Sequence, residues 1–159
     1  MTLAGPFALG GNKMIVTSVR RFVEHRPLAQ INPDASVRDA CHVLDRLNVG
    51  ALAVLTGEHL QGVLSERDVI RKCICQSRLT ADTRVSEIMT ADPVTIDAGE
   101  PPARALKLMT AGRFRHLPIV DGGKVVGLLS IRDIPAEYHL MFERFGNATR
   151  DGRQEAGRP

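Results

Sequence analysis

GLLSIRD, at Gly127–Asp133, and GVLSERD, at Gly62–Asp68, are near copies of one segment within a chain of 159 residues. In each copy a short apolar run ends at a serine, and the polar turn after it opens a stretch with apolar residues at helical spacing. This pattern predicts a strand that runs directly into the first turn of a helix. Such a junction presents unpaired backbone N–H groups and the positive end of the helix dipole, which favour a phosphate or another anion.

The two copies belong to a longer internal duplication. Ile31–Ile70 aligns with Ile96–Pro135 at a constant offset of about 65 residues and without a gap. Identity is densest in the GxLSxRD segment, which a need for core volume explains least well. Each unit has the order strand, helix, strand, strand, helix, so the sequence predicts an α/β fold of two repeats. We assign residues 14–78 to repeat 1 and residues 79–145 to repeat 2.

The apolar spacing within repeat 1 predicts three strands and two helices. The strands are Leu28–Ile31, Ala51–Leu55 and Gln61–Leu64, and the helices are Ser36–Asn48 and Glu66–Cys75. Both helices are expected to bury one apolar face, which includes Leu47 in the first helix and Ile70 and Ile74 in the second. Ile15–Val23 and Arg84–Met89 are expected to form matching short helices ahead of the two repeats.

Repeat 2 follows the same order, and its prolines set its helix boundaries. Pro101 and Pro102 fit the first turn of a helix, where a missing N–H costs little. Pro135 lies a few residues into the closing helix, and we expect it to bend or interrupt that helix directly after Asp133. The apolar residues around and beyond it are expected to pack either on a partner copy or on the chain's own core; they are Ile134, Tyr138, Met141, Phe142 and Phe145.

Composition bounds the class of protein. Hydrophobic residues make up 43% and charged residues 25% of the chain, which is typical of a globular protein. Aromatic residues are scarce at 4%, and the net charge of +3 is spread without a dense basic run, so nucleic acid is not expected as a partner. No apolar stretch has membrane-spanning length and the N-terminus lacks an export pattern, so a cytoplasmic protein without membrane contact is expected. Residues 1–13 and 146–159 are expected to be flexible termini.

Cysteines and histidines give no pattern for a metal centre or a catalytic site. Cys41, Cys73 and Cys75 lack zinc-like spacing, which favours reduced thiols and no bound metal. The five histidines stand in unrelated contexts, and none has a Cys or Ser partner at a recognisable motif spacing. We therefore expect no enzyme activity; His116 is the one candidate for a general base near the GxLSxRD segments.

The GxLSxRD segments support two compatible interpretations. A Ser at the N-cap with an acid three residues later resembles a capping box, in which each side chain satisfies a backbone N–H of the helix. Capping does not account for an Arg at the same position in both copies. A carboxylate can accept both ribose hydroxyls and an Arg can hold phosphate oxygens, so nucleotide binding is favoured, with capping as a simultaneous role. The candidate residues are Ser65, Arg67 and Asp68 in repeat 1 and Ser130, Arg132 and Asp133 in repeat 2.

Two longer stretches, VSEIMTADPVTI at residues 85–96 and RHLPIVDGGKVVGLLSIRDI at residues 115–134, resemble a cystathionine-β-synthase (CBS) domain. The whole chain from Ser18 to Phe145 resembles a tandem pair of such domains, a Bateman module. The resemblance implies two βαββα repeats packed through their sheets around a pseudo-twofold axis. It also implies two clefts that bind adenosine compounds, with AMP favoured and ADP, ATP, NAD(H) or S-adenosylmethionine as alternatives. Such modules generally have no chemistry of their own and pair into flat homodimers.

The resemblance also implies roles for individual residues. It places the ribose on the motif Asp, phosphate on the motif Ser, and phosphate near Arg115 and His116, which could otherwise be solvated turn residues. Adenine would be read by backbone groups of Asp92–Thr95 and of Pro27–Gln30, beside apolar residues. The residues implied in this way are Asp92, Pro93, Val94, Thr95, Ala29, Gly50, Ala51, Val63 and Leu128.

The two predicted clefts should not be equivalent. Gly50 and Ala51 stand in repeat 1 where repeat 2 has Arg115 and His116, and Ala53 replaces Pro118. Together with the matched motifs, the resemblance implies a regulatory protein that senses an adenosine nucleotide and passes the signal to another protein. The alternative is a structural or interaction module that dimerises and whose clefts are vestigial.

Overall fold

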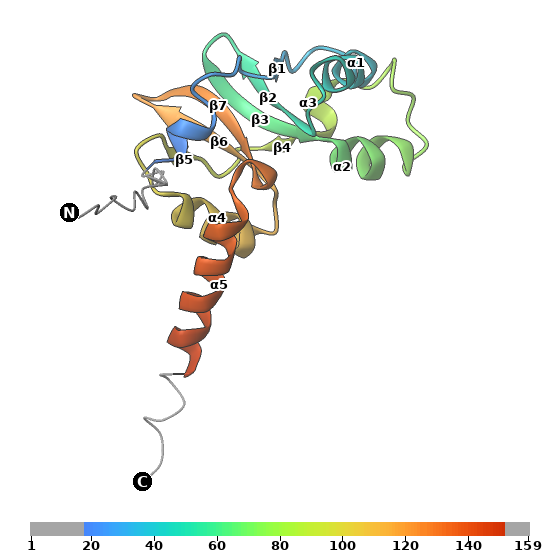
Figure 1. Cartoon of the computed structure of the whole chain (residues 1–159). Helices are drawn as coiled ribbons and strands as arrows, with labels where there is room; N and C mark the ends of the chain where they lie inside the picture. The colour runs from blue at the N-terminus through green and yellow to red at the C-terminus, as the bar shows by residue number, and fades with distance from the viewer. Residues whose placement is uncertain (1–17, 152–159) are drawn as a thin grey trace, which may run out of the picture.

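The computed structural model describes residues 18–151, with side chains through residue 144. The chain forms an α/β fold of two repeats, each a mixed sheet with helices (Figure 1). The first sheet has the order β1-β2-β3-β4, formed by Gln30–Ile31, Ala51–Thr56, His59–Ser65 and Thr90–Ala91. The second has the order β5-β6-β7, formed by Ile96–Asp97, His116–Asp121 and Lys124–Ser130. The helices are η1 (Val19–Phe22), α1 (Val37–Leu47), α2 (Glu66–Asp68), η2 (Val69–Ile74), α3 (Val85–Ile88), α4 (Pro102–Gly112), η3 (Ile131–Asp133) and α5 (Ala136–Asp151).

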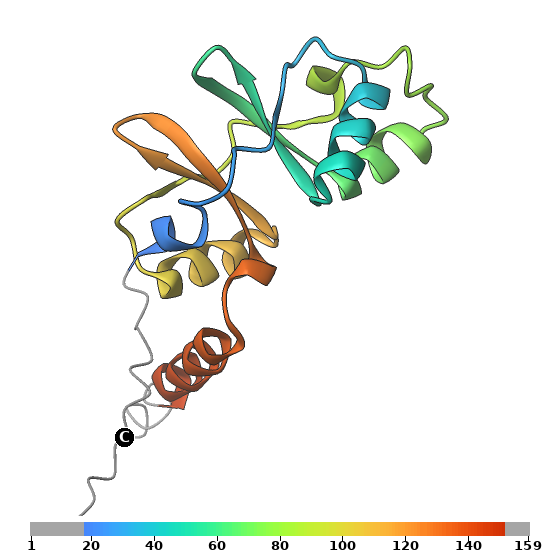
Figure 2. The ribbon, with the colours of Figure 1, turned by 45° about the horizontal axis from the view of Figure 1, so that its top comes forward.

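The two sheets meet along their hairpins. In both sheets the first strand runs parallel to the second, and the second and third form an antiparallel hairpin. Strand β7 contacts both β2 and β3, and Figures 1 and 2 show the two hairpins side by side. At the hairpin tips, Lys124 Nζ lies 2.8 Å from Glu58 Oε1. The predicted duplication is thus visible as two matched sheets in contact.

The short helices ahead of the repeats are exchanged between them. Val19 and Val23, in and after η1, are buried in the core of repeat 2, whereas Val85 and Ile88 of α3 are buried in the core of repeat 1. Strand β4, which follows α3, accordingly pairs with β3 of repeat 1. These segments confirm the short helices predicted before each repeat, as far as residues 18–151 show them, and they tie each repeat to the beginning of the other.

The exchange explains the glycine of GxLSxRD. A Cβ on Gly62 would lie 2.6 Å from the carbonyl oxygen of Thr90, and a Cβ on Gly127 would lie 2.5 Å from Val23 Cγ2. Both distances are shorter than side chains tolerate, so only glycine lets the exchanged segment approach each β-strand so closely. The densest identity between the repeats therefore has a packing cause as well as a chemical one.

Two predicted helices differ from the sequence interpretation at their outer faces. Leu47 of α1 is exposed, because Leu44 and Ala40 already fill the core side of that helix. After α2 the chain continues with i→i+5 hydrogen bonds, such as Cys75 N–H to the Ile70 carbonyl at 2.8 Å. This wider winding leaves the side chains of Ile70 and Ile74 each 55% exposed, so the prediction that they are buried is wrong.

Pro135 interrupts the last helix, as the sequence predicts. After η3 ends at Asp133, Ile134 adopts an extended conformation with φ −85° and ψ 119°, which suits a residue before proline. Helix α5 then starts at Ala136, packs against α4, and extends away from both sheets (Figures 1 and 2). Tyr138 and Phe142 contact the chain's own core, whereas Met141 is exposed; the side chain of Phe145 lies outside the described residues. Within residues 18–151, no helix is long and apolar enough to span a membrane.

Candidate functional site

The register of each sheet brings the predicted site residues to one end. In repeat 2, His116 at the start of β6 pairs with Ser130 at the end of β7. Strand β5 runs parallel to β6 with Ile96 opposite Ile119, so Val94, two residues before Ile96, lies at the same end of the sheet. In repeat 1, Ala51 pairs with Ser65 in the same way. Each repeat therefore gathers a backbone edge, a motif serine and a helix start in one place.

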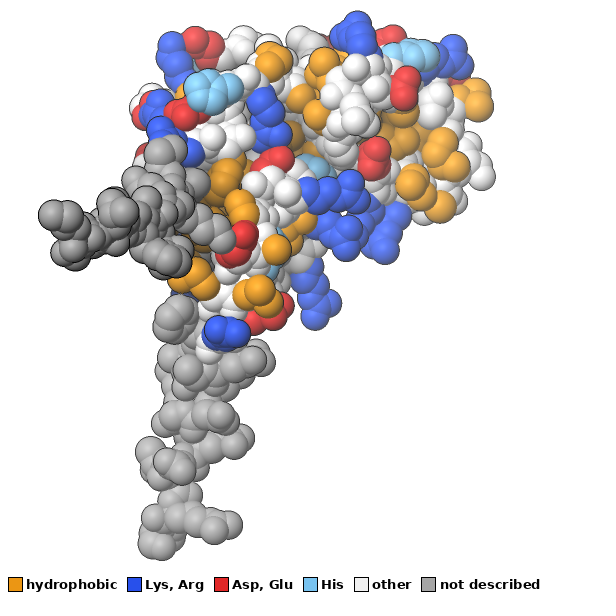
Figure 3. Space-filling model, in the orientation of Figure 1, with side chains coloured by type: hydrophobic (Ala, Val, Ile, Leu, Met, Phe, Trp, Pro, Cys, Tyr) orange, Lys and Arg blue, Asp and Glu red, His pale blue; other side chains and the backbone are white. Residues whose placement is uncertain are grey.

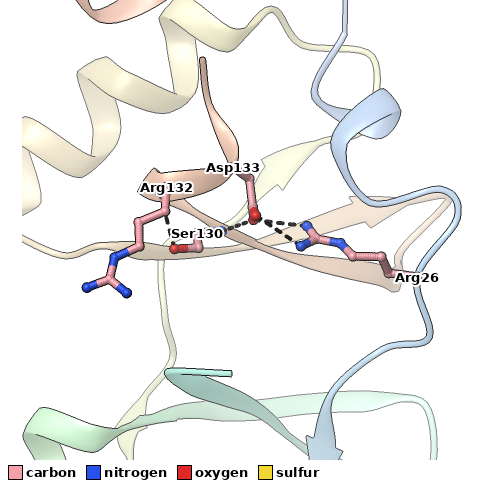
Figure 4. Close-up of polar contacts among 4 residues, drawn as sticks. All are labelled: Arg26, Ser130, Arg132 and Asp133. Atoms are coloured by element: carbon pink, nitrogen blue, oxygen red, sulfur yellow. Dashed lines mark hydrogen bonds and ion pairs between the residues drawn. The ribbon is translucent and has the colours of Figure 1, made fainter. Parts of the chain in front are cut away.

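Asp133 is held by both its own motif and the other repeat. Its Oδ2 accepts a hydrogen bond from the Ser130 backbone N–H at 2.7 Å, which confirms the predicted cap. Both carboxylate oxygens also accept from Arg26, with Nη1 2.9 Å from Oδ1 and Nη2 2.9 Å from Oδ2 (Figure 4). This bond raises the pKa of the Arg26 guanidinium further. Arg26 precedes β1, so its contact crosses from repeat 1 to repeat 2.

Arg132 faces away from that ion pair. Figure 4 shows its guanidinium on the opposite side of Ser130 from Asp133 and Arg26. The Arg132 backbone N–H donates to Ser130 Oγ at 3.3 Å, so the serine hydroxyl takes part in the cap. The Asp and the Arg of the motif are therefore directed to different sides of the serine, as separate ribose and phosphate contacts would require.

Arg115 and Arg132 line an open hollow of about 700 Å³ beside the start of α5. Its other lining residues are Ile131, Ile134, Pro135, Ala136, His139 and Leu140. Among the described residues, none forms an ion pair with the guanidinium of Arg115 or Arg132. On the face shown in Figure 3, Lys and Arg side chains gather below α2, in the angle between the repeats. This part of the surface can attract an anion of phosphate size.

His116 lies where the two repeats approach each other. An ideal Cβ on Gly50 would lie 3.3 Å from His116 Nε2, so the glycine makes room for the imidazole of the other repeat. Burial lowers the pKa of His116 below 6.5, while the nearby charges of Asp133 and Glu66 oppose that shift. His116 is therefore neutral at pH 7 and can donate or accept one hydrogen bond without carrying charge.

Asp68 forms its hydrogen bonds and its ion pair within its own repeat. Its Oδ2 accepts from the Ser65 backbone N–H at 3.0 Å and from Ser65 Oγ at 2.8 Å, so the predicted capping box is confirmed here too. Its Oδ1 lies 2.8 Å from Nζ of Lys72, four residues later on the same helix. Lys72 Nζ also donates to the Ile88 carbonyl at 3.1 Å, which ties the cation to the core side of α3. Arg67 is exposed and has no ion-pair partner among the described residues.

The predicted adenine edges also differ. In repeat 1 the Ala53 N–H donates to the Ala29 carbonyl at 2.9 Å. The corresponding residues of repeat 2, 65 positions later, are Pro118 and Val94. Proline has no N–H, and none of the described residues donates a hydrogen bond to the Val94 carbonyl. The backbone edge predicted for repeat 1 is therefore partly used by its sheet, whereas the edge of repeat 2 retains a free acceptor.

The remaining predicted residues surround these groups. Ala51 and Val63 are buried, Leu128 and Pro93 are half-buried, and Thr95 is exposed. Asp92 adopts a left-handed conformation with φ 46°, and its N–H donates to the Gln61 carbonyl at 3.3 Å. Within the part of the chain that the structure describes, no group of three or more His, Cys, Asp or Glu side chains is arranged to hold a metal ion.

Sequence reasoning missed Arg26 and Lys72, and only one of them left a local signal. Lys72 stands four residues after Asp68, a spacing that favours an ion pair on a helix. Arg26 stands 107 residues before Asp133, and nothing in the local sequence links the two. Its position directly before the predicted adenine edge Pro27–Gln30 is the one hint that it lies near a cleft.

Comparison with known proteins identifies the family. The CBS domain model matches residues 19–74 and 85–138, which together form more than half of the chain. The chain belongs to the CBS domain family. It is a tandem pair of CBS domains, as the resemblance of its motifs implies.

Relatives of this CBS domain pair include proteins of bacteria, archaea and plants. It is 39% identical over 106 residues to the mitochondrial CBS domain-containing protein CBSX3 of Arabidopsis thaliana, covering 64% of this chain and 52% of the plant protein, about half its length. A solved candidate signal-transduction protein with CBS domains from Burkholderia ambifaria has 36% identity and a TM-score of 0.69, covering 74% of this chain and 90% of its own. A CBS domain protein from Pyrobaculum aerophilum, solved in complex with AMP, has 24% identity and a TM-score of 0.72, with coverages of 80% and 98%.

Proposed function

We propose that this CBS domain pair is a regulatory sensor that binds an adenosine nucleotide, with AMP favoured, at the end of the repeat 2 sheet. The observation that carries the proposal is that groups able to contact adenine, ribose and phosphate lie together at that end. Val94 offers a free carbonyl to the adenine amino group, Asp133 offers a carboxylate to the ribose, and Arg115 and Arg132 offer guanidinium groups to phosphate.

Family membership supports this choice of ligand. The Pyrobaculum aerophilum protein was solved with AMP, although its low identity relates it to this chain by fold alone. ADP, ATP and NAD(H) share adenosine and a first phosphate with AMP, so the same three contacts would serve them. S-adenosylmethionine shares the adenosine but has no phosphate, so only the adenine and ribose contacts would serve it. The open side of the hollow leaves room for a longer group beyond the first phosphate.

The proposed role is binding without chemistry. His116, the candidate general base, is neutral at pH 7, but it lies against Gly50 of the other repeat. In the proposed site it stabilises phosphate by a hydrogen bond instead of activating a nucleophile. The signal would consist of a change in how the repeats contact each other, read by an effector protein.

A second copy of the chain is the partner that we propose for the outer helices of repeat 1. The side chains of Ile70 and Ile74 on η2 and Leu47 on α1 are exposed apolar groups, which a homodimer would cover. Light scattering after gel filtration is expected to give the mass of a dimer, and the Ile70→Glu, Ile74→Glu double variant that of a monomer. A monomeric wild type would contradict this proposal and leave nucleotide sensing unaffected.

The alternative, an interaction module with vestigial clefts, makes the opposite prediction about ligands. Mass spectrometry of small molecules released from the denatured protein is expected to detect an adenine nucleotide. Calorimetric titration of the emptied protein with AMP then measures affinity. A protein that carries no nucleotide and binds none of the five adenosine compounds at millimolar concentration contradicts the sensor and favours the interaction module.

A pair of matched variants tests which carboxylate is used. Asp133→Ala is expected to weaken AMP binding about 10- to 100-fold, because hydrogen bonds to a charged group contribute about 1.5–3 kcal/mol. Asp68→Ala removes the same cap and the same charge from repeat 1. It is expected to change AMP affinity less than about twofold, because a partly exposed charge that does not touch the ligand contributes little to its binding. Equal losses in both variants would show that both clefts bind.

A further inference from the structure

Arg26 occupies the two atoms that a ribose would need. Its guanidinium donates to both oxygens of the Asp133 carboxylate at 2.9 Å, and Oδ2 also accepts a hydrogen bond from the Ser130 N–H. The 2′ and 3′ hydroxyls of a ribose would donate to the same two oxygens. A planar guanidinium in this bidentate geometry leaves no direction in its plane for a second pair of donors. Ribose and Arg26 therefore cannot hold Asp133 at the same time.

The contact can be exchanged. The Arg26 side chain is 48% exposed and that of Asp133 is 19% exposed, so water can replace either partner. No other described side chain or carbonyl accepts a hydrogen bond from the Arg26 guanidinium. Lys72 differs, because its ammonium is fixed to the Ile88 carbonyl as well as to Asp68.

Exchange of this contact would alter the contact between the repeats. Arg26 follows η1, whose flanking residue Val23 is buried in the repeat 2 core, and it directly precedes the segment that leads into β1 of repeat 1. The ion pair thus fixes the point where the chain passes from one repeat to the other. Loss of the ion pair would leave the packing of Val19 and Val23 intact and would free residues 24–29, the crossing segment between η1 and β1.

We propose that Arg26 competes with the ribose for Asp133. The Arg26 guanidinium blocks both carboxylate oxygens of Asp133 until a nucleotide displaces it. The inference rests on the proposed function and names the contact that nucleotide binding exchanges. Binding then converts an ion pair between the repeats into a contact with ligand, and the released crossing segment carries the signal. A ligand shifts such an equilibrium only by the difference between its affinities for the state in which Asp133 is free of Arg26 and the state in which the two are paired.

Calorimetric titration with AMP tests the proposal on the full chain emptied of nucleotide. Arg26→Ala is expected to bind AMP about threefold to tenfold more tightly than wild type, since an exposed ion pair of ordinary strength keeps Asp133 blocked in most wild-type molecules. Arg26→Lys keeps the positive charge but cannot donate to both carboxylate oxygens in the same bidentate way. Its AMP affinity is expected to lie between those of wild type and Arg26→Ala. Arg20→Ala is the matched control: Arg20 pairs with Asp121 of repeat 2 from the same segment, and its loss should leave affinity unchanged.

The sign of the effect separates a competitor from a phosphate contact. If Arg26 bound phosphate, Arg26→Ala would weaken AMP binding, and that result would overturn the proposal. Equal affinities of wild type and Arg26→Ala would overturn it too, while the proposed function stands. If neither protein binds AMP or the other adenosine compounds, the proposed function fails together with the inference.

Hydrogen exchange gives a second readout that does not depend on affinity. In wild type, saturating AMP is expected to raise exchange in the crossing segment, residues 24–29, because the ion pair is lost. In Arg26→Ala the same segment should exchange fast with or without AMP. An AMP-induced decrease in wild type would contradict release of this segment. Thermal unfolding of each variant confirms that the comparison is made between folded proteins.

Discussion

Asp68 and Asp133 start from the same motif and end in different ion pairs. Asp68 pairs with Lys72, one turn later on a continuous helix. In repeat 2 the corresponding helix ends at Asp133, before Pro135, and the position that matches Lys72 holds Glu137, so no cation stands one turn after Asp133. The carboxylate of Asp133 instead recruits Arg26 from the other repeat. The break before Pro135 and the acidic Glu137 thus leave Asp133 without a local cation, and its ion pair reaches the segment that precedes β1 instead.

The same asymmetry extends along each sheet end. Repeat 1 has Ala53, whose N–H closes the Ala29 carbonyl, and Ala51, which cannot hold charge. Repeat 2 has Pro118 and His116 at the matching positions. Each difference leaves repeat 1 more closed and repeat 2 more available to a ligand. The comparison indicates that duplication supplied two similar frames and that a few substitutions made repeat 1 the more closed of the two, whereas the proposed binding site lies in repeat 2.

The largest effect is expected where the repeats are most alike. Gly62→Ala should lower the free energy of unfolding by about 2–3 kcal/mol and Gly127→Ala by about 1–2 kcal/mol, because overpacking a closed site forces its neighbours to move. Gly62 faces a backbone carbonyl, which yields less than the Val23 side chain that faces Gly127. Urea unfolding measures both.

Gly57→Ala is the control for this pair. Gly57 has open space around its Cβ but a φ of +59°, so backbone strain alone should cost about 1–2 kcal/mol there. A loss in Gly62→Ala no larger than that of the control would contradict the role assigned to close packing of the exchanged segment. Equal losses of unfolding free energy at Gly62 and Gly127 would mean that the Val23 side chain yields no more than the Thr90 carbonyl does, so the two repeats would be packed equally tightly at this point.

An intermediate effect is expected from exchanging the residues at the adenine edges. Pro118→Ala supplies an N–H that can bond the Val94 carbonyl, and should weaken AMP binding about fivefold, the equivalent of one hydrogen bond of about 1 kcal/mol. Slow amide exchange at position 118 would report the new bond. The reciprocal variant Ala53→Pro removes a hydrogen bond in repeat 1 and should lower stability by about 1 kcal/mol with AMP affinity unchanged. Loss of AMP affinity in Ala53→Pro would mean that the repeat 1 edge also binds.

The smallest effect concerns pH and sets His116 against Ala51, which does not titrate. Burial lowers the His116 pKa below 6.5 in the folded state, against the opposing charges of Asp133 and Glu66 and with support from Arg132 and Arg115. The unfolded chain therefore binds more protons just below pH 6.5, so stability should fall as the pH falls through that value.

Urea unfolding between pH 5 and pH 8 checks this slope against His116→Gln. The variant keeps a hydrogen-bonding side chain that does not titrate, so its stability should depend less on pH in this window. Identical slopes in both proteins would show that His116 is as accessible to protons in the folded state as in the unfolded chain. AMP binding should reduce the slope of the wild type, because a phosphate beside His116 favours its protonated form.

Much of the fold could be predicted because it is written in short-range patterns. Strand–turn–helix junctions at Ser65 and Ser130, the capping carboxylates and the break at Pro135 each depend on neighbours within a few residues. The predictions for Ile70 and Ile74 failed because helical spacing was assumed, whereas the chain winds with i→i+5 hydrogen bonds there. The exchange of η1 and α3 between the repeats was not predicted, because it depends on contacts between segments that lie far apart in the sequence.

By itself, the sequence determined that two like α/β units exist, where their junctions fall and that the residues at their sheet ends differ, since duplication, capping and proline chemistry act locally. Tertiary structure alone decided which charges meet. The pairing of Arg26 with Asp133 depends on the exchange of η1 into repeat 2, and the free Val94 carbonyl depends on a strand register that places Pro118 beside it. Contacts between segments about a hundred residues apart follow from packing of the whole chain, to which no local pattern of residues is sensitive.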